Sequence, residues 1–186
     1  MASDSFGGSS QTSGMSRASE SGSASKTNTS RSLSSNKICT FWIGERCFGL
    51  DTALVGEVVS IDEHIPVPLA PPAIHGIFNL RGEPLPLVSL AEVLGIAPTV
   101  SQAKTKTAMV LRSGDLAAGL SIDRVEAILS TDRGTLTPPT NAAEDSIVLG
   151  FLEITTEKMS SVVSVLDPTN LLEKLSQLRY VQSENT

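Results

Sequence analysis

Residues 64–90 read HIPVPLAPPAIHGIFNLRGEPLPLVSL, a largely apolar stretch that carries one fixed positive charge, Arg81. Apolar runs lead into and out of the break Asn79-Leu80-Arg81-Gly82, which predicts two strands joined by a turn. Arginine cannot shed its charge, and burying an unpaired charge costs several kcal/mol or more. Arg81 must therefore either pair within the protein, with Glu83 or Glu57, or stand at the turn, where the acceptors of a partner can reach it.

Alternating apolar residues predict a hairpin upstream of this stretch, with strands at 38–43 and 46–50 and a two-residue turn at Gly44-Glu45. The apolar side chains of one face are Cys39, Phe41, Ile43, Phe48 and Leu50. The turn opposes Trp42 to Cys47 and Leu50 to Cys39, so the two cysteines lie on opposite faces of the sheet. We therefore expect no disulfide, as is usual for a cytosolic protein.

Between this hairpin and the Arg81 turn the chain continues in short elements. A helical turn with Asp51 as its cap is expected at 51–55, and a strand at 58–61. In residues 65–69 apolar side chains alternate with prolines, which cannot donate to a ladder. That segment should therefore lie at the margin of a sheet.

The rest of the chain again predicts short strands. Ser89 and Glu92 fit a capping box that opens a short helix, which Gly95 stops. After a polar loop at 97–106, strands are expected at 107–112, 115–121, 124–130, 147–155 and 159–166, with a long connection at 131–146 and a turn around Glu157-Lys158. Asp167-Pro168 caps a last helix with the apolar face Leu171, Leu172, Leu175 and Leu178. Many short strands with regular turns and few helices predict an all-β barrel or sandwich.

A hairpin followed by a similar strand occurs twice, once at Val55-Gly-Glu57-Val-Val and once at Val125-Glu126-Ala-Ile128-Leu. Two similar small barrels side by side would produce such a repeat, although chance would also produce it.

Composition and charge limit the classes of function. The 186 residues suffice for one ordinary domain and a tail, and 40% hydrophobic with 4% aromatic residues predicts an aliphatic core. A net charge of −6 and a pI near 4.9 argue against nucleic acid as a partner. No stretch approaches the roughly 20 apolar residues that span a bilayer, and the N-terminus lacks the pattern of a signal peptide. We therefore expect a cytoplasmic protein without direct membrane insertion.

Residues 1–36 are mostly Ser, Gly, Thr and Asn without apolar periodicity. Such a segment buries too little apolar surface to offset the entropy of ordering its backbone. We predict a disordered Ser-rich tail that folding does not need, followed by a domain at 37–182. Its serines either accept phosphate or are simply linker composition.

Catalysis is the least favoured class of function. We find no cofactor-binding motif and no metal-ligand spacing, and the histidines, His64 and His75, lie in a Pro-rich segment where they are expected to line a surface. Glu57, Asp123 and Glu126 could converge as an acidic cluster. A peptide-binding SH3-like module is a second alternative, but its grooves are rich in Tyr and Trp, of which this chain has one each.

Several motifs together resemble the CheW family of bacterial chemotaxis coupling proteins, over roughly residues 38–180. They are Phe-x-Ile-Gly-Glu-x-x-Phe-Gly-Leu-Asp at 41–51, Val55-x-Glu57-Val, Ile-Pro-Val-Pro-x-Ala-Pro-Pro-x-Ile-x-Gly-Ile-x-Asn-Leu-Arg-Gly at 65–82, Pro-Leu-Val-x-Leu at 86–90, Gly-Leu-x-Ile-Asp-x-Val at 119–125 and Leu166-Asp-x-x-x-Leu-Leu. The resemblance implies two SH3-like five-stranded β-barrel subdomains around a shared core, with short helices and a C-terminal helix.

The resemblance also implies a function without catalysis, cofactor or metal. Members of the family join the cytoplasmic tips of methyl-accepting receptors to the regulatory domain of the histidine kinase CheA. By the resemblance, Arg81, Asn79 and Gly82 mark the receptor side, and the residues also implicated in coupling are Val55, Glu57 and Gly76. We expect Glu57 to face outward and to contribute to a partner contact. The Ser-rich extension is not a family feature, which leaves open a related motility or chemosensory pathway. A detached kinase regulatory domain has the same fold, but the free tail and the absence of any ATP-binding segment favour a separate adaptor.

Overall fold

The computed structural model describes residues 33–97, 107–140, 143–155 and 160–180, which all belong to one compact unit, Arg31–Thr186. The expectations for most of the tail, for the loop after residue 97 and for the turn around Glu157-Lys158 fall outside these residues.

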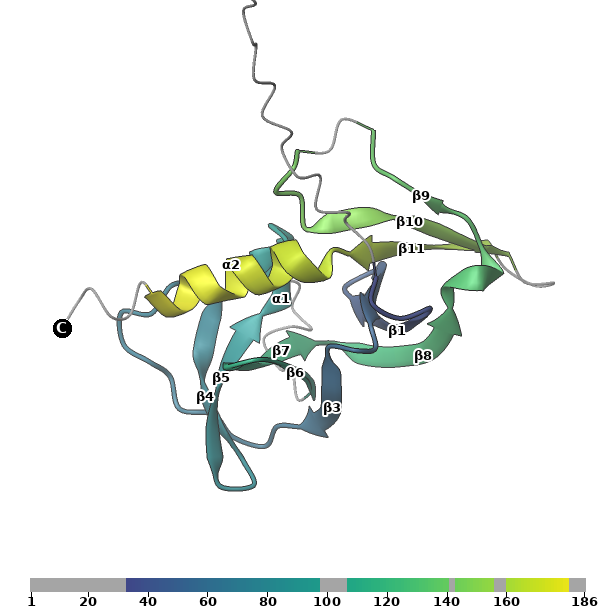
Figure 1. The fold of residues 1–186 in the computed structure, drawn as a ribbon. Helices are drawn as coiled ribbons and strands as arrows, with labels where there is room; N and C mark the ends of the chain where they lie inside the picture. The colour runs from purple at the N-terminus through teal and green to yellow at the C-terminus, as the bar shows by residue number, and fades with distance from the viewer. Residues whose placement is uncertain (1–32, 98–106, 141–142, 156–159, 181–186) are drawn as a thin grey trace, which may run out of the picture. The chain divides into compact units, whose positions relative to one another are not determined.

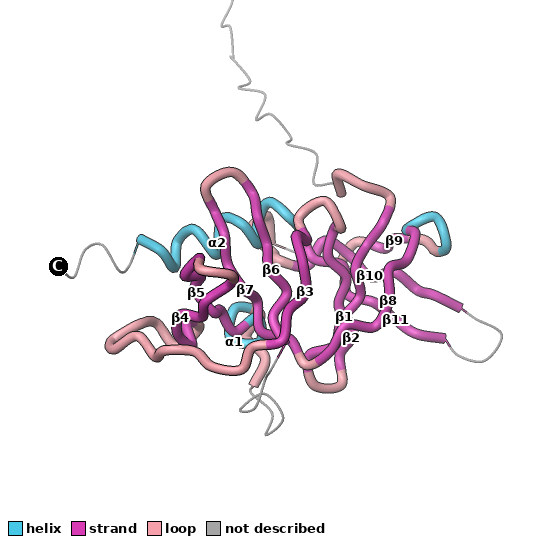
Figure 2. Tube along the Cα trace, turned by 90° about the horizontal axis from the view of Figure 1, so that it is seen from below, coloured by secondary structure: helices cyan, strands magenta, loops and turns pink. Residues whose placement is uncertain are grey.

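The strands form two sheets, which we call the first and second subdomain (Figures 1 and 2). In order across the first sheet they are β8 (Arg124–Ser130), β1 (Lys37–Ile43), β2 (Arg46–Asp51), β11 (Ser160–Leu166), β10 (Val148–Thr155) and β9 (Leu136–Thr137). Across the second they are β3 (Val55–Ser60), β6 (Thr107–Ser113), β7 (Leu116–Ile122), β5 (Glu83–Ser89) and β4 (Ile74–Leu80). The expected class, all-β with two subdomains, is confirmed, and the two-residue β9 adds a sixth strand to the first sheet.

The strand that follows each central hairpin lies in the opposite sheet. β3 follows the β1–β2 hairpin along the chain but pairs with β6, whereas β8 follows the β6–β7 hairpin but pairs with β1. A bulge interrupts β3 after Val55 and β8 after Val125, at matching places of the repeated sequence. Each sheet also contains one parallel pair, β2 with β11 and β7 with β5. The repeat is therefore structural, and the two subdomains exchange an edge strand.

The apolar residues pack into three clusters. The largest, which we call the central core, draws from both sheets and both helices: Cys39, Phe41, Ile43, Phe48, Leu50, Val88, Leu90, Ala91, Met109, Leu111, Leu116, Ala118, Leu120, Ile122, Leu166, Leu171 and Leu175. It contains the whole predicted apolar face of the first hairpin. Smaller cores belong to the first sheet (Ile38, Leu152, Ile154, Val163, Val165) and the second (Ile61, Phe78, Leu80, Leu85, Leu87, Ala108, Val110). Strands β1 and β6 are thus buried on both faces.

Both predicted α-helices are present with their expected caps. Helix α1 (Leu90–Val93) begins after Ser89, whose Oγ accepts from the backbone N–H of Glu92 at 3.3 Å. Helix α2 (Pro168–Tyr180) begins after Asp167, whose carboxylate accepts from the N–H of Asn170 at 3.0 Å. The central core includes residues from each helix, so α1 and α2 both contribute to the contact between the two subdomains.

The hairpin register is confirmed, with Trp42 opposite Cys47 and Cys39 opposite Leu50, and both thiols are free. Residues 52–54 form the expected hydrogen-bonded turn, in which the carboxylate of Asp51 accepts from the N–H of Ala53 at 2.9 Å. One other segment differs from expectation. Of the expected margin segment at 65–69, only Ile65 pairs, through two backbone hydrogen bonds of 2.8 Å with Ile77. Pro66 and Pro68, which follow Ile65, have no backbone N–H and cannot donate the hydrogen bonds that would extend this ladder.

Contacts of the first subdomain begin before residue 37. Leu33 packs against the core of the first sheet, and Ser34 and Ser35 donate to the carboxylate of the fully buried Asp51. The last residues of the predicted tail therefore contact the domain.

Candidate functional site

The β4–β5 turn presents Arg81 as the sequence predicts. Arg81 and Gly82 both have positive φ, 53° and 94°, the conformation of a two-residue hairpin turn with mirror-image geometry. The Oδ1 atom of Asn79 accepts from the N–H of Gly82 at 2.7 Å and holds the turn. Glycine is suited to the second position, whereas Arg81 adopts a backbone conformation that is unfavourable for most residues other than glycine.

Gly76 has a different role, inside β4. Its φ is +156°, and a Cβ atom there would lie 2.4 Å from the carbonyl oxygen of Ile65. Any larger residue would separate Ile65 from Ile77 and free the segment that leads into β4. Gly76 therefore acts on the site by shaping the backbone, since it offers no side chain to a partner.

Arg81 pairs with Glu57 across the two edges of the second sheet. The Nη2 atom of Arg81 lies 2.9 Å from Oε2 of Glu57, although β3 and β4 are the outermost strands of this sheet. The side chain of Arg81 is 79% exposed and that of Glu57 is 30% exposed. The pair brings the two sheet edges together on the surface and leaves most of the guanidinium accessible.

A second ion pair lies beside the first. Arg112 on β6 donates two hydrogen bonds to Glu83 on β5, of 3.1 and 2.5 Å. These bonds lower the pKa of Glu83 and raise that of Arg112. We call Glu57, Arg81, Glu83 and Arg112 the charged cluster. It consists of two acidic and two basic side chains, which lie on β3, β5, β6 and the β4–β5 turn of the second sheet.

The orientation of Glu57 corrects one expectation. We expected its side chain to face outward, but it is half-buried on the same face of β3 as Val59. Val59 packs against the core of the second sheet and brings Glu57, two residues away, to the same side, whereas the bulge after Val55 puts Val55 on the other face. Val55 packs against the central core, and the carboxylate of Glu57 reaches Arg81.

Two exposed apolar residues at matching places were not singled out from the sequence. Val58 on β3 lies opposite Met109, and Ile128 on β8 lies opposite Cys39, both of which belong to the central core. Directly opposed residues share a sheet face, so Val58 and Ile128 extend the apolar surface of the central core at its two margins. They are 42% and 65% exposed. We call Val58 and Ile128 the apolar pair. They occupy matching positions of the repeated sequence, and this was the signal that could have identified them.

The acidic residues that could have formed a catalytic cluster do not converge. Glu57 pairs with Arg81 in the second sheet, Asp123 accepts from the N–H of Gly44 at 2.6 Å, and Glu126 accepts from the indole N–H of Trp42 at 2.8 Å. The described parts of the chain contain no group of three or more His, Cys, Asp and Glu arranged to hold a metal ion.

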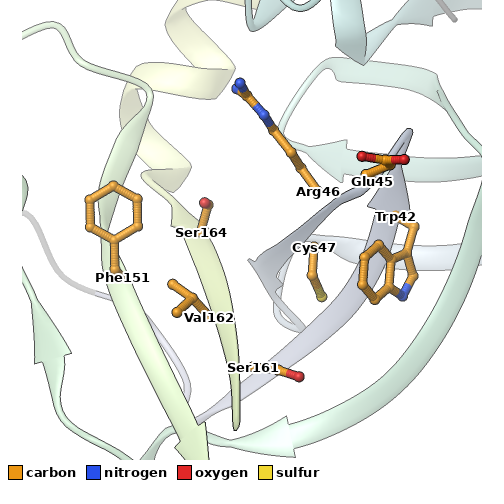
Figure 3. A pocket seen from close by; sticks show the side chains of 8 residues that line it. All are labelled: Trp42, Glu45, Arg46, Cys47, Phe151, Ser161, Val162 and Ser164. Atoms are coloured by element: carbon orange, nitrogen blue, oxygen red, sulfur yellow. The ribbon is translucent and has the colours of Figure 1, made fainter. Parts of the chain in front are cut away.

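A pocket of about 340 Å³ lies at the β1–β2 turn (Figure 3). The hairpin contributes Trp42, Glu45, Arg46 and Cys47, and β10 and β11 contribute Phe151, Ser161, Val162 and Ser164. Burial and the charge of Glu126 raise the pKa of the Cys47 thiol, and Arg124 only partly opposes them. Since the thiolate is the nucleophile, this environment does not activate Cys47.

Comparison with known proteins places these features in a family. The family model for the CheW-like domain matches residues 37–176. A chemotaxis protein CheW from Thermotoga maritima is 32% identical over 50% of this chain and 60% of its own length, and one from Treponema pallidum is 27% identical over 55% and 62%. The matched region thus spans about three fifths of these relatives.

A solved structure agrees with the sequence comparison. The scaffolding protein TtCheW from Thermoanaerobacter tengcongensis is 27% identical, with a TM-score of 0.59 over 70% of this chain and 88% of that one. No helix within the described residues is long and apolar enough to cross a membrane. With the family model matching most of its length, this chain belongs to the family of proteins with a CheW-like domain.

Proposed function

We propose that this protein is a non-catalytic adaptor that couples the cytoplasmic tips of methyl-accepting chemotaxis receptors to the regulatory domain of the histidine kinase CheA. Family membership and relatives named chemotaxis protein CheW support this function, as does a structural neighbour described as a scaffolding protein. It would act in the cytoplasm and reach membrane receptor arrays through its partners.

The observation that carries the proposal is the presence of two different surfaces on either side of β3. Glu57 turns to one face and joins the charged cluster, whereas its neighbour Val58 turns to the other face and belongs to the apolar pair. An adaptor needs two surfaces that separate partners can occupy together. Adjacent residues of one edge strand provide them here, because successive side chains of a strand point to opposite faces.

The two surfaces suit different contacts. Arg81 offers a planar fork of donors, most of which remains exposed, and such a fork matches carboxylates and backbone carbonyls. The apolar pair extends a core surface, the kind of surface on which an amphipathic helix lays its apolar face. The resemblance assigns the receptor to the Arg81 turn, but a helical receptor tip would also suit the apolar pair.

Binding measurements with single-surface variants test the proposal and separate these assignments. Arg81→Ala alters the charged cluster, and Val58→Ser with Ile128→Ser alters the apolar pair. Each protein is titrated with a receptor cytoplasmic fragment and, separately, with the kinase regulatory domain. Each variant should weaken binding of one partner at least tenfold and leave the other within about threefold. Each variant thus serves as the folded control for the other.

Three results would contradict the proposal or a part of it. If both variants bind both partners as the unaltered chain does, neither surface is a coupling site. If each variant loses both partners while its unfolding midpoint is unchanged, the two partners share one surface and the chain cannot join them. Turnover of any substrate by the chain would contradict the non-catalytic part of the proposal.

A further inference from the structure

Asp51, the last residue of β2, is a fully buried carboxylate whose donors come mostly from the chain ahead of β1. It accepts from the backbone N–H groups of Ser34 and of Ser35, the second at 3.0 Å, and from the Oγ–H of Ser35 at 2.6 Å. The N–H of Ala53 donates a further bond to this carboxylate, at 2.9 Å. A buried carboxylate is costly unless it is hydrogen-bonded, so residues 33–36 stabilise Asp51 as much as Asp51 holds them.

The same residue holds the crossing from the first subdomain to the second. The N–H of Leu54 donates to the carbonyl of Asp51 at 3.1 Å, and the N–H of Val55 donates to that of Thr52 at 3.2 Å. Thr52 is in turn fixed by a bond of 3.1 Å from its N–H to the carbonyl of Lys37. β3 begins directly after this turn, so the contacts of Ser34 and Ser35 help to position Val55 and, through it, Glu57.

Two further contacts hold residues 33–36 in place. The carbonyl of Asn36 accepts from the N–H of Thr131 at 2.9 Å, and Leu33 packs against the core of the first sheet. The segment therefore connects the β2–β3 turn with the residues that follow β8. In the sequence it is continuous with the Ser-rich stretch of residues 1–32.

We propose that residues 33–36 form a latch that fixes the β2–β3 turn and hence the position of β3, and that opens when Ser35 carries a negative charge. When the latch is closed, Ser35 Oγ–H bonds to Asp51 and the β2–β3 turn is fixed. A negative charge on Ser35 opposes the buried carboxylate of Asp51 at hydrogen-bond distance and opens the latch. The latch itself rests on these contacts alone, whereas its effect on partners rests on the proposed function.

Amide hydrogen exchange on the full chain tests the latch. Ser35→Glu introduces the charge at the contact with Asp51. Ser34→Glu is the matched control, since it adds the same charge one residue earlier, on a side chain that is exposed while only its backbone bonds to Asp51. Ser35→Ala removes the hydroxyl and keeps both backbone donors.

In Ser35→Glu, exchange at the amides of Ser35, Ala53 and Val55 should rise about tenfold or more, because the first two lose their bonds to the Asp51 carboxylate and the third belongs to the turn that these bonds hold. Ser34→Glu should change these rates much less, and Ser35→Ala should give an intermediate rise. Equal rates in Ser35→Glu and Ser34→Glu would overturn the latch. A rise confined to Ser35, with Ala53 and Val55 unchanged, would overturn the connection to β3.

Partner binding distinguishes the latch from the function on which its effect rests. Ser35→Glu should weaken binding of the partner that also depends on Arg81. Arg81→Ala should weaken binding of the same partner without changing amide exchange at Ala53. Increased exchange with unaltered binding would overturn control of the site by the latch. If the unaltered chain binds neither partner, the proposed function fails, while the exchange result still decides whether the latch exists.

Discussion

At the scale of single residues, Arg81 and Glu57 determine how the charged cluster should be interpreted. The sequence left two alternatives for Arg81, pairing within the protein and exposure at the turn. The structure combines them, because Arg81 pairs with Glu57 and still has most of its side chain exposed. The sequence left Glu83 and Glu57 as possible partners, and the choice of Glu57 could not be predicted because it depends on the two edges of one sheet meeting in space. The orientation of Glu57 could have been predicted from the parity with Val59, but the bulge that places Val55 on the other face could not.

We expect Arg81→Ala to change the free energy of unfolding by no more than about 1 kcal/mol, because exposed ion pairs contribute little. Binding of the partner at the turn should fall by about 2–4 kcal/mol, the usual cost of truncating a central interfacial arginine. Arg81→Lys keeps the charge without the planar fork, so its affinity for this partner should lie between those of the unaltered chain and of Arg81→Ala. Urea unfolding and titration of the same preparations measure both quantities. Normal binding with a large fall in the unfolding midpoint would make Arg81 a structural residue.

Asp51 predicts a specific response to acid. Burial raises its pKa, but hydrogen bonds from Ser35, Ala53 and Ser34 outweigh burial and bring the pKa below its ordinary value of 3.8. A carboxyl whose pKa is lower in the folded state stabilises the fold above its unfolded-state pKa and loses this contribution as pH falls through the folded-state value.

The unfolding free energy should therefore decline below about pH 4 in the unaltered chain and decline less steeply in Asp51→Asn. Urea midpoints measured from pH 7 downward give the two slopes, which can be compared even if the substitution lowers stability at every pH. Equal slopes of urea midpoint against pH in the two proteins below about pH 4 would show that Asp51 does not contribute to the pH dependence.

At the scale of elements, local patterns predicted most strands and both helix caps, because alternation and capping residues act over a few positions. They missed β9, which has two residues in a Thr- and Pro-rich connection, and they extended the 65–69 segment beyond its one bridged residue. They also gave no sign of the contacts that residues 33–36 make with the first subdomain. Ser34 and Ser35 carry no apolar signal, and their role depends on a carboxylate that lies far along the sequence.

Two truncations define where the domain begins. A chain that starts at Leu33 should melt as the full chain does, since it keeps the latch. A chain that starts at Lys37 leaves the carboxylate of Asp51 short of donors, which costs about 1–3 kcal/mol and should lower the melting temperature by several degrees. Calorimetry of the two proteins measures the difference. Equal melting temperatures would show that residues 33–36 do not stabilise the fold.

At the scale of the whole molecule, the exchange of edge strands makes the two subdomains interdependent. The sequence repeat suggested two small barrels, but a local pattern does not reveal which hairpin a strand will join. The pairings β1–β8, β2–β11, β3–β6 and β5–β7 each join a strand before residue 97 to one after residue 107. Each sheet is therefore assembled from both halves of the chain.

We accordingly expect fragments 33–97 and 107–186 to lack a cooperative unfolding transition when each is alone, and to regain one when mixed. Neither half contains a complete sheet or the central core. Circular dichroism during thermal unfolding of each fragment and of the equimolar mixture is the measurement. A cooperative transition in either isolated fragment would show that its strands pair without their partners in the other half.

The central claim, that two surfaces flank β3 and serve two partners at once, is tested most directly by a titration. The kinase regulatory domain is added to the full chain that has first been saturated with a receptor cytoplasmic fragment, and its affinity is compared with that for the free chain. We predict formation of a ternary complex with a dissociation constant within about threefold of the binary value, a difference below about 1 kcal/mol. Displacement of the receptor fragment by the kinase domain would contradict the claim.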